Sequence, residues 1–357
     1  MNEVSIIGVD LAKNVFQLHG SGADGSVLFR RQVRRAQFLE FFEAHERCIV
    51  AMEACASAHH WGRQLQVMGY EVCLIAPAYV KPFVKRQKND AADAEAIAEA
   101  ASRPTMRFVA VKGAEKQSEA MILKTRDLLV RQKTQTINAL RAHLAEYGVV
   151  APKGTTNLVR LKEALADDGT SLPPVVVAMG KVLVDHIEAL EKQITGLTRQ
   201  IEQRARTDDT SKRLMTIPGV ASIIAVAITA LAPPPEMFKN GRGFAAWIGL
   251  TQKQNSTGGK TVLGRTSKMG QRDLRRLLVV GATSVVSAAG RWGTRDPWLT
   301  RMLAKGKPRK LIAVALAARM ARVAWVLLHR GGVYETPVPI RSLRARDRAE
   351  TSESVRG

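Results

Sequence analysis

VSIIGVDLAK, residues 4–13, is the stretch that decides the fold of the first third of the chain. It opens with an apolar, β-branched run that predicts a buried strand over Val4–Val9, and the acidic Asp10 follows directly. Two more segments, Asn14–His19 and Val27–Val33, also read as strands, and the glycine-rich residues between them predict a turn. The chain therefore begins with three strands joined by hairpins.

The next part of the sequence alternates helix and strand signals. Helices are predicted over Gln37–His45 and Ala58–Met68, and strands over Cys48–Met52 and Glu71–Ile75. Three hairpin-connected strands followed by strands that alternate with helices is the order of a ribonuclease H-like α/β domain. We assign residues 1–112 to such a domain.

Long helical segments follow, over Ala114–Tyr147 and Val175–Thr207, and residues 113–210 form the predicted helical, coiled-coil region. An apolar stripe with spacings of three and four runs along the second helix, at Ile187, Leu190, Ile194, Leu197 and Ile201. Such a stripe on a polar helix is a coiled-coil or bundle seam. It either packs against its own chain or mediates self-association.

Residues 211–333 predict a mainly helical C-terminal domain. The segment LMTIPGV, residues 214–220, and the apolar run after it resemble a helix-hairpin-helix element, whose backbone amides hold a DNA phosphate without reading sequence. The last stretch, residues 334–357, is rich in Arg, Ser and Glu and is predicted to be a disordered tail.

The composition indicates a polyanionic partner. Lys and Arg number 54 against 32 Asp and Glu, which gives a net charge of +22 spread along the whole chain. The alternative is a well-solvated basic surface. Aromatic residues make up only 5 %, so contact with phosphates is favoured over stacking on bases. The candidate nucleic-acid contacts are Lys85, Arg86, Lys88, Arg126, Arg131, Lys260, Arg265, Lys268 and Arg272.

The cysteines and the apolar runs exclude other classes. Cys48, Cys55 and Cys73 lack C-x-x-C spacing, so neither a disulfide framework nor a zinc site is indicated. We find no signal peptide and expect no apolar run that could span a bilayer. A cytoplasmic protein without membrane contact is predicted.

Four acidic residues suggest a metal site. Asp10 and Glu53 each follow an apolar strand, and Asp90 and Asp93 begin a predicted helix at a spacing that places both on one face. Each has an ordinary alternative, as a strand end or as a helix cap. Together they form an oxygen-only set that favours Mg²⁺ or Mn²⁺ over zinc. Two such ions about 4 Å apart would stabilise the attacking and leaving oxygens of a phosphodiester displacement.

At these residues the sequence resembles insertion-sequence transposases of the one-ten family, and within it the subgroup typified by insertion sequence eleven-eleven. The order Asp10, Glu53, Asp90, Asp93 looks like the DEDD set of that family, whose N-terminal domain is similar to the RuvC resolvase. The motifs that carry the resemblance are GVDLAK (8–13), MEAC (52–55), KNDAADAEAIAE (88–99), IPGV (217–220), WIGL (247–250) and STGGK (256–260). They occur in the expected order over about residues 4–333.

The resemblance implies a recombinase that uses a structured non-coding RNA of its own element, the bridge RNA, to choose donor and target DNA. It also implies homo-oligomers, from dimer to tetramer, in which the metal domain of one subunit completes the serine site of another. A serine in the glycine-rich loop would be the nucleophile. The family's usual position is taken here by Thr257, and Ser256 precedes it. We assign the role to Ser256 because a primary hydroxyl is less hindered, with Thr257 as the alternative.

Two other functions compete with a serine transposase. A junction-resolving nuclease would use the carboxylates alone and leaves the serine loop unexplained. A non-catalytic DNA-binding protein would carry four acids that repel its own ligand. In a serine transposase, the basic residues that follow the loop, from Lys260 to Arg272, would hold the scissile phosphate.

Overall fold

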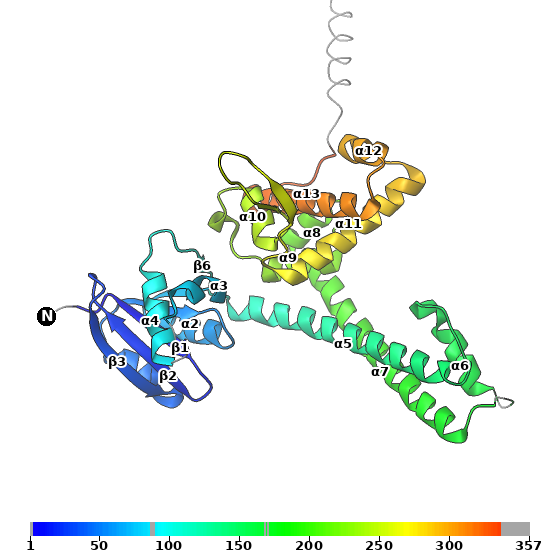
Figure 1. Ribbon diagram of the computed structural model, residues 1–357, viewed down its shortest axis with the longest axis horizontal. Helices are drawn as coiled ribbons and strands as arrows, with labels where there is room; N and C mark the ends of the chain where they lie inside the picture. The colour runs from blue at the N-terminus through cyan, green and yellow to red at the C-terminus, as the bar shows by residue number, and fades with distance from the viewer. Residues whose placement is uncertain (1–2, 86–89, 168, 170, 337–357) are drawn as a thin grey trace, which may run out of the picture. The chain divides into compact units, whose positions relative to one another are not determined.

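The computed structural model describes residues 3–85, 90–167, 169 and 171–336 of the chain. They separate into two compact units, Met1–Gln117 and Ser118–Gly357 (Figure 1). A finer division of the second unit into a helical region and a C-terminal domain stays a prediction.

The first unit is built on a six-stranded sheet, within the described residues, in the order β3-β2-β1-β4-β5-β6. β1, β4 and β5 run parallel, whereas β2, β3 and β6 are antiparallel to their neighbours. The predicted order of strands and helices is confirmed, and this mixed α/β sheet is consistent with a RuvC-like domain. The strands are β1 (Ile6–Leu11), β2 (Val15–Ser21), β3 (Val27–Arg34), β4 (Ile49–Glu53), β5 (Glu71–Ile75) and β6 (Phe108–Val109).

Helices cover both faces of this sheet (Figure 1). α1 (Phe38–Glu43) and α2 (Ala58–Val67) pack on the face that carries Ile7, Val9 and Phe16. α3 (Pro77–Val80) and α4 (Asp90–Ala101) pack on the face that carries Ile6. Since successive side chains of a strand point to opposite faces, Asp10 lies on the α4 side together with Ile6 and Gly8.

Two long helices pair within the second unit. α5 (Ala114–Ala145) and α7 (Pro174–Thr207) run antiparallel, with Lys133 bound to Glu191 at 2.9 Å and Arg204 to Glu119 at 2.6 Å. The stripe residues Ile187, Leu190 and Ile201 are buried. This part of the seam therefore packs against its own chain, and its use in self-association stays a prediction. α6 (Leu158–Ala166) packs on α7 and shares a core with both long helices (Figure 1).

The rest of the second unit is mainly helical. α8 and α9 are joined by a turn in which Gly219 has a φ of +87°, and a Cβ there would lie 2.8 Å from the Gly281 carbonyl oxygen of α11. The turn thus packs closely on α11, and its contact with DNA stays a prediction. The elements are α8 (Asp209–Met215), α9 (Ser222–Leu231), α10 (Gly241–Ile248), β7 (Gln252–Gln254), β8 (Leu263–Thr266), α11 (Arg272–Trp292), α12 (Pro297–Ala304) and α13 (Arg309–Arg330).

The C-terminal end of the described chain bears on two sequence-based expectations. α13 is long and apolar enough to cross a membrane, with a mean hydropathy of 2.0, so the expectation of no such run was wrong. Half of that apolar stretch is buried, and its Ile312, Leu316 and Met320 lie in the largest core. Of the predicted tail, residues 337–357 lie outside the described residues, whereas the Tyr334 amide donates to Thr216 Oγ1.

Candidate active site

Three of the four predicted metal ligands meet in the first unit. Carboxylate oxygens of Asp10, Asp90 and Asp93 lie within 4.8 Å of one another. Asp90 is exposed, and the other two are half-buried. A solvent-accessible cluster of three carboxylates at the end of a strand is therefore present.

Close packing of α4 on β1 brings the three carboxylates together. A Cβ placed on Gly8 would lie 2.3 Å from the Ala94 carbonyl oxygen and 2.8 Å from the Ala98 side chain. Only a glycine on the strand and small alanines on the helix allow this approach. Asp10 is the next residue of β1 on the same face of the sheet as Gly8, and Asp93 directly precedes Ala94 on α4. The close contact of Gly8 with Ala94 therefore brings the carboxylates of Asp10 and Asp93 to the same end of the β1–α4 interface.

Glu53 lies close to this cluster, although it is outside the group of three. β1 and β4 are parallel and their last registered pair is Val9 with Met52, so Asp10 and Glu53 follow on neighbouring strands. Burial raises the pKa of Glu53, and the charge of Asp93 raises it further. The charge of Glu53 in turn raises the pKa of Asp10, so the fourth predicted ligand is within electrostatic reach of Asp93 and Asp10.

The cluster is electrostatically unfavourable without a cation. Burial raises the pKa of Asp10 to about 6, and the negative charges of Asp93, Asp90 and Glu53 add to the shift. Like charges gathered in this way disfavour ionisation, and a bound divalent cation reverses that preference. The oxygen-only donor set fits a hard cation such as Mg²⁺ or Mn²⁺.

Replacing Asp10 should stabilise the metal-free protein. The pKa of Asp10 is higher in the folded than in the unfolded chain, so the folded state gains from protonation at low pH and loses that gain as the pH rises through about 6. At pH 7.5 in EDTA, Asp10→Asn should therefore raise the free energy of unfolding by about 1 kcal/mol, after allowance for solvent screening. Denaturant titration measures this difference. Mg²⁺ should then stabilise the wild type more than the variant, and a variant that is less stable in EDTA would contradict the repulsion.

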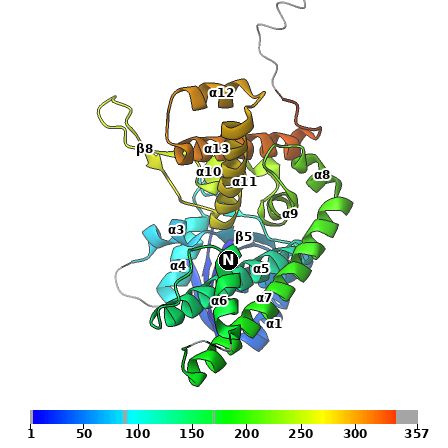
Figure 2. The same ribbon diagram turned by 90° about the vertical axis from the view of Figure 1, so that its right-hand side faces the viewer.

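The predicted serine loop forms the tip of a β-hairpin in the second unit (Figure 2). Thr257 and Lys260 exchange both backbone hydrogen bonds, at 3.0 and 3.3 Å, around Gly258 and Gly259. Both glycines have positive φ, +54° and +77°, which is the type I′ geometry that suits a two-residue hairpin turn. The glycine-rich turn is therefore a structural requirement of the hairpin, whatever its chemistry.

Ser256 and Thr257 point to opposite faces of this hairpin. The pairing of Thr257 with Lys260, and the hydrogen bond from the Asn255 amide to the Val262 carbonyl, place Ser256 opposite Thr261. Successive residues of an extended pair face opposite ways. Both hydroxyl-bearing residues are exposed. Lys260 thus shares a face with Thr257 and not with Ser256.

The other basic residues predicted on the C-terminal side are also accessible. Arg265 lies on β8, Arg272 is the first residue of α11, and both are exposed. Lys268 is exposed in the connection between β8 and α11, where its φ is +54°. These side chains are available to a phosphate near the hairpin.

The basic residues predicted on the N-terminal side are more engaged. Lys85 binds Glu95 at 2.5 Å, and Arg131 lies 3.4 Å from Asp127. Arg126 donates through Nε to Thr198 Oγ1 at 2.8 Å, and burial lowers its pKa. Arg126 therefore links α5 to α7, whereas Arg86 and Lys88 lie outside the described residues.

One basic group was missed in the sequence. Arg30, Arg31, Arg34 and Arg35 fall within six residues on and just after the edge strand β3, and all four are absent from the predicted contacts. The signal was the density of arginine in a strand whose alternate positions should be apolar.

Comparison with known proteins places these features in a common context. Residues 7–149 match the DEDD transposase family of IS110 elements, and residues 211–297 match the family described as "Transposase IS116/IS110/IS902 family". A Pseudomonas aeruginosa protein named "Probable family 20 transposase" is 44 % identical, over 93 % of this chain and 98 % of its own length. The transposase for insertion sequence element IS1328 of Yersinia enterocolitica is 37 % identical, over 94 % and 99 %. That for IS1111A of Coxiella burnetii is 36 % identical, over 94 % and 92 %.

Proposed function

Because the chain belongs to the IS110/IS116/IS902 family of transposases, we propose that it cuts and rejoins DNA through a covalent phosphoserine, with the help of a divalent metal and under the guidance of an RNA. The observation that carries the proposal is the meeting of Asp10, Asp90 and Asp93 within 4.8 Å. The protein would work in the cytosol, as a homo-oligomer.

The metal would be held by Asp10, Asp90 and Asp93, with Glu53 at the neighbouring strand end. When bound, Mg²⁺ would act as a Lewis acid on a phosphodiester oxygen. The carboxylates hold the ion and supply the negative charge that attracts it. Asp10 is half-buried at the end of β1 and would form the inner side of the site. Asp90 is exposed, so the outer side would be open to a nucleic-acid strand.

The nucleophile would be Ser256, at the tip of the hairpin. Its exposed position allows a DNA strand to reach the hydroxyl, and Lys260, Arg265 and Arg272 nearby in the chain supply positive charge for the scissile phosphate. Attack on phosphorus would form the Ser256 Oγ–P bond with loss of the serine hydroxyl proton. It would break the P–O bond to the 3′ or 5′ oxygen of the cut strand, which takes up a proton and leaves as a hydroxyl. Reversal of the same exchange with the new strand would rejoin the DNA.

Two alternatives differ from this proposal in their observable products. A junction-resolving nuclease would break DNA in a metal-dependent way without forming protein–DNA adducts. A non-catalytic DNA-binding protein would do neither, and the clustered acids would then only weaken its hold on DNA, because they repel phosphates. Assays for adducts and for Mg²⁺-dependent strand breakage separate all three.

We propose further that the first unit and the adjoining helices carry the guide RNA. Lys85 and Arg131 are 71 % and 70 % exposed, and their ion pairs are of the surface kind that contributes little to stability, so both side chains are free to exchange a carboxylate for a phosphate. Arg126 would hold α5 and α7 together. Arg86 and Lys88 complete the predicted set.

A structured RNA of the element should copurify with the protein. Purification from cells that carry the element, nuclease digestion and sequencing of the protected fragments would identify it, and its binding should weaken strongly with salt because neutralised phosphates release counterions. Protein from cells without the element is the control. Recombination at the full rate by RNA-free protein would refute guidance and leave the carboxylate and serine chemistry untouched.

A further inference from the structure

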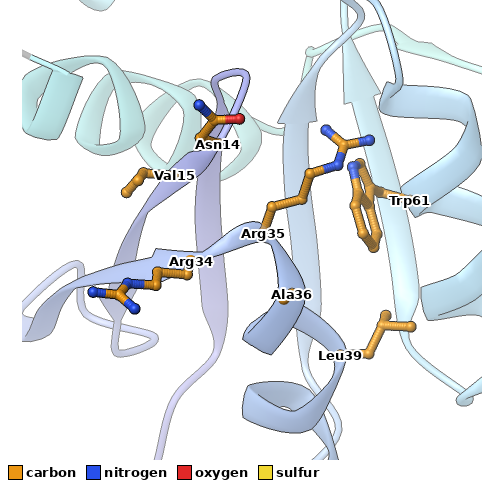
Figure 3. A pocket seen from close by; sticks show the side chains of 7 residues that line it. All are labelled: Asn14, Val15, Arg34, Arg35, Ala36, Leu39 and Trp61. Carbon is orange, nitrogen blue, oxygen red and sulfur yellow. The ribbon is translucent and has the colours of Figure 1, made fainter.

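A second nucleic-acid site is suggested by a pocket of about 670 Å³ in the first unit. It lies where β3 ends, beside the turn between β1 and β2, and is lined by Asn14, Arg34, Arg35, Leu39 and Trp61 among others (Figure 3). Arg35 and Trp61 belong to the face of the sheet covered by α1 and α2, whereas Asp10 lies on the α4 face. The pocket is therefore separate from the carboxylate cluster.

Its positive charge is not neutralised within the described part of the chain. Neither Arg34 nor Arg35 forms an ion pair there, and the lining contains no carboxylate. The Arg35 guanidinium is held 5.1 Å from the Trp61 ring centre and 5.8 Å from that of Phe16, and its backbone amide donates to the Asn14 carbonyl at 2.8 Å. Arg35 Nη1 also donates to the Lys13 carbonyl at 3.5 Å. The charge is thus held in place by aromatic stacking and this one hydrogen bond, and the other N–H groups of the guanidinium are left to bind an anion.

Trp61 adds an independent indication of a missing acceptor. The residue is only 7 % exposed, and its indole Nε1 is buried without a hydrogen-bond partner in the described structure. An indole N–H can only donate, and a buried donor without a partner is costly. Figure 3 shows this nitrogen on the edge of the ring nearest to the Arg35 guanidinium.

The lining specifies the chemistry of the ligand. Guanidinium and indole N–H groups are donors, and Val15 and Leu39 add apolar wall. Arg34 and Arg35 point away from each other in Figure 3, an arrangement that suits successive phosphates of one strand better than a single ion. In a chain of net charge +22, we infer that this pocket binds the phosphodiester backbone of an RNA or DNA strand, on the face of the sheet opposite the carboxylates.

This inference rests on the proposed function only in assuming that the protein handles nucleic-acid strands. The test uses the full-length protein, 30-nucleotide single-stranded RNA and DNA of one sequence, and EDTA, so that the metal site does not contribute. Arg34→Gln/Arg35→Gln should weaken binding about 10-fold to 100-fold near 0.1 M salt, and reduce the slope of log K against log salt by about 1.4, the value for two single-strand phosphates. If the double variant weakens the binding of RNA alone, or of DNA alone, that result would identify which kind of strand the pocket binds.

The matched control is Arg103→Gln/Lys212→Gln, which removes the same charge from two exposed residues elsewhere, each paired with an acid on its own helix or next to it. Trp61→Phe keeps an aromatic ring and removes the N–H, and should weaken binding several-fold. If thermal unfolding shows that a pocket variant is destabilised, Arg34→Gln alone serves, because that side chain is exposed. Equal binding by the pocket variants and the control, for both RNA and DNA, would overturn the inference.

The inference and the proposed function can fail separately. Asp93→Asn keeps the pocket, so it should not lose binding to either strand. If the protein shows no metal-dependent strand breakage but the pocket variants still lose binding, the pocket inference stands and the proposed chemistry is wrong. If strand breakage is normal but the pocket variants bind like the control, the proposed chemistry stands and the pocket inference is wrong.

Discussion

Asp93→Asn should reduce recombination by about 100-fold or more, the scale expected when a group that acts directly on the transition state is removed. Asp93 is the residue through which the acidic cluster is coupled. Its charge is the largest electrostatic influence on the pKa of both Asp10 and Glu53, and its oxygen lies within 4.8 Å of those of Asp10 and Asp90. The amide keeps the volume of the side chain but removes an anionic ligand, so metal binding falls while the fold is kept.

Single-turnover strand breakage in Mg²⁺, with circular dichroism to confirm folding, measures this effect. Asp209→Asn is the control, since it removes the same charge from an exposed position at the start of α8, where Asp209 pairs with Lys212. The control should cut DNA at the wild-type rate. Recombination by Asp93→Asn at the native rate would show that these carboxylates do not hold the catalytic metal.

The architecture of the first unit could be predicted because its signals are local. Buried strands read as apolar runs, and residues that end them, such as Asp10 and Glu53, are visible without knowledge of the neighbours. The spacing of Asp90 and Asp93 likewise predicted that both lie on one face of a helix. The predicted helix and strand limits over residues 4–75 differ from the observed ones by only a few residues.

The features that complete the site depend on contacts distant in sequence. No local pattern indicates that Ala94 of α4 approaches Gly8 of β1, although this contact is what brings Asp93 to Asp10. The same holds for the Arg35–Trp61 stack, which joins the end of β3 to α2. The sequence reading also missed that α13 is long and apolar enough to cross a membrane, although half of that stretch is buried in the core of the second unit.

The turn chemistry of the serine loop was visible in the sequence, but its consequence was not. Gly258-Gly259 predicts a turn, yet only the pairing of Thr257 with Lys260 shows that Ser256 and Thr257 face opposite ways. A phosphate that approaches one face of the hairpin can therefore meet only one of the two hydroxyls directly. The choice between Ser256 and Thr257 as the nucleophile can therefore be tested by experiment.

Ser256→Ala should abolish covalent protein–DNA adducts, a loss of about 1,000-fold or more, because removal of a nucleophile leaves no other route to the intermediate. Thr257→Ala should still form adducts, since the hairpin hydrogen bonds of residue 257 are made by its backbone. Denaturing gels of reactions with end-labelled DNA, followed by mass spectrometry of the DNA-linked peptide, identify the attacking residue. A serine hydroxyl needs a base or a metal to activate it, so wild-type adducts should also disappear in EDTA.

Loss of adducts in Thr257→Ala and not in Ser256→Ala would be equally informative. Lys260 shares a face with Thr257 and would hold a phosphate on that side of the hairpin. Adducts that survive Ser256→Ala and vanish with Thr257→Ala would move the nucleophile to Thr257 and the scissile phosphate to the Lys260 face. Lys260→Gln then separates the two geometries. It should slow adduct formation strongly if the strand binds on the Thr257 face, and only weakly if the strand binds on the face of Ser256 and Thr261.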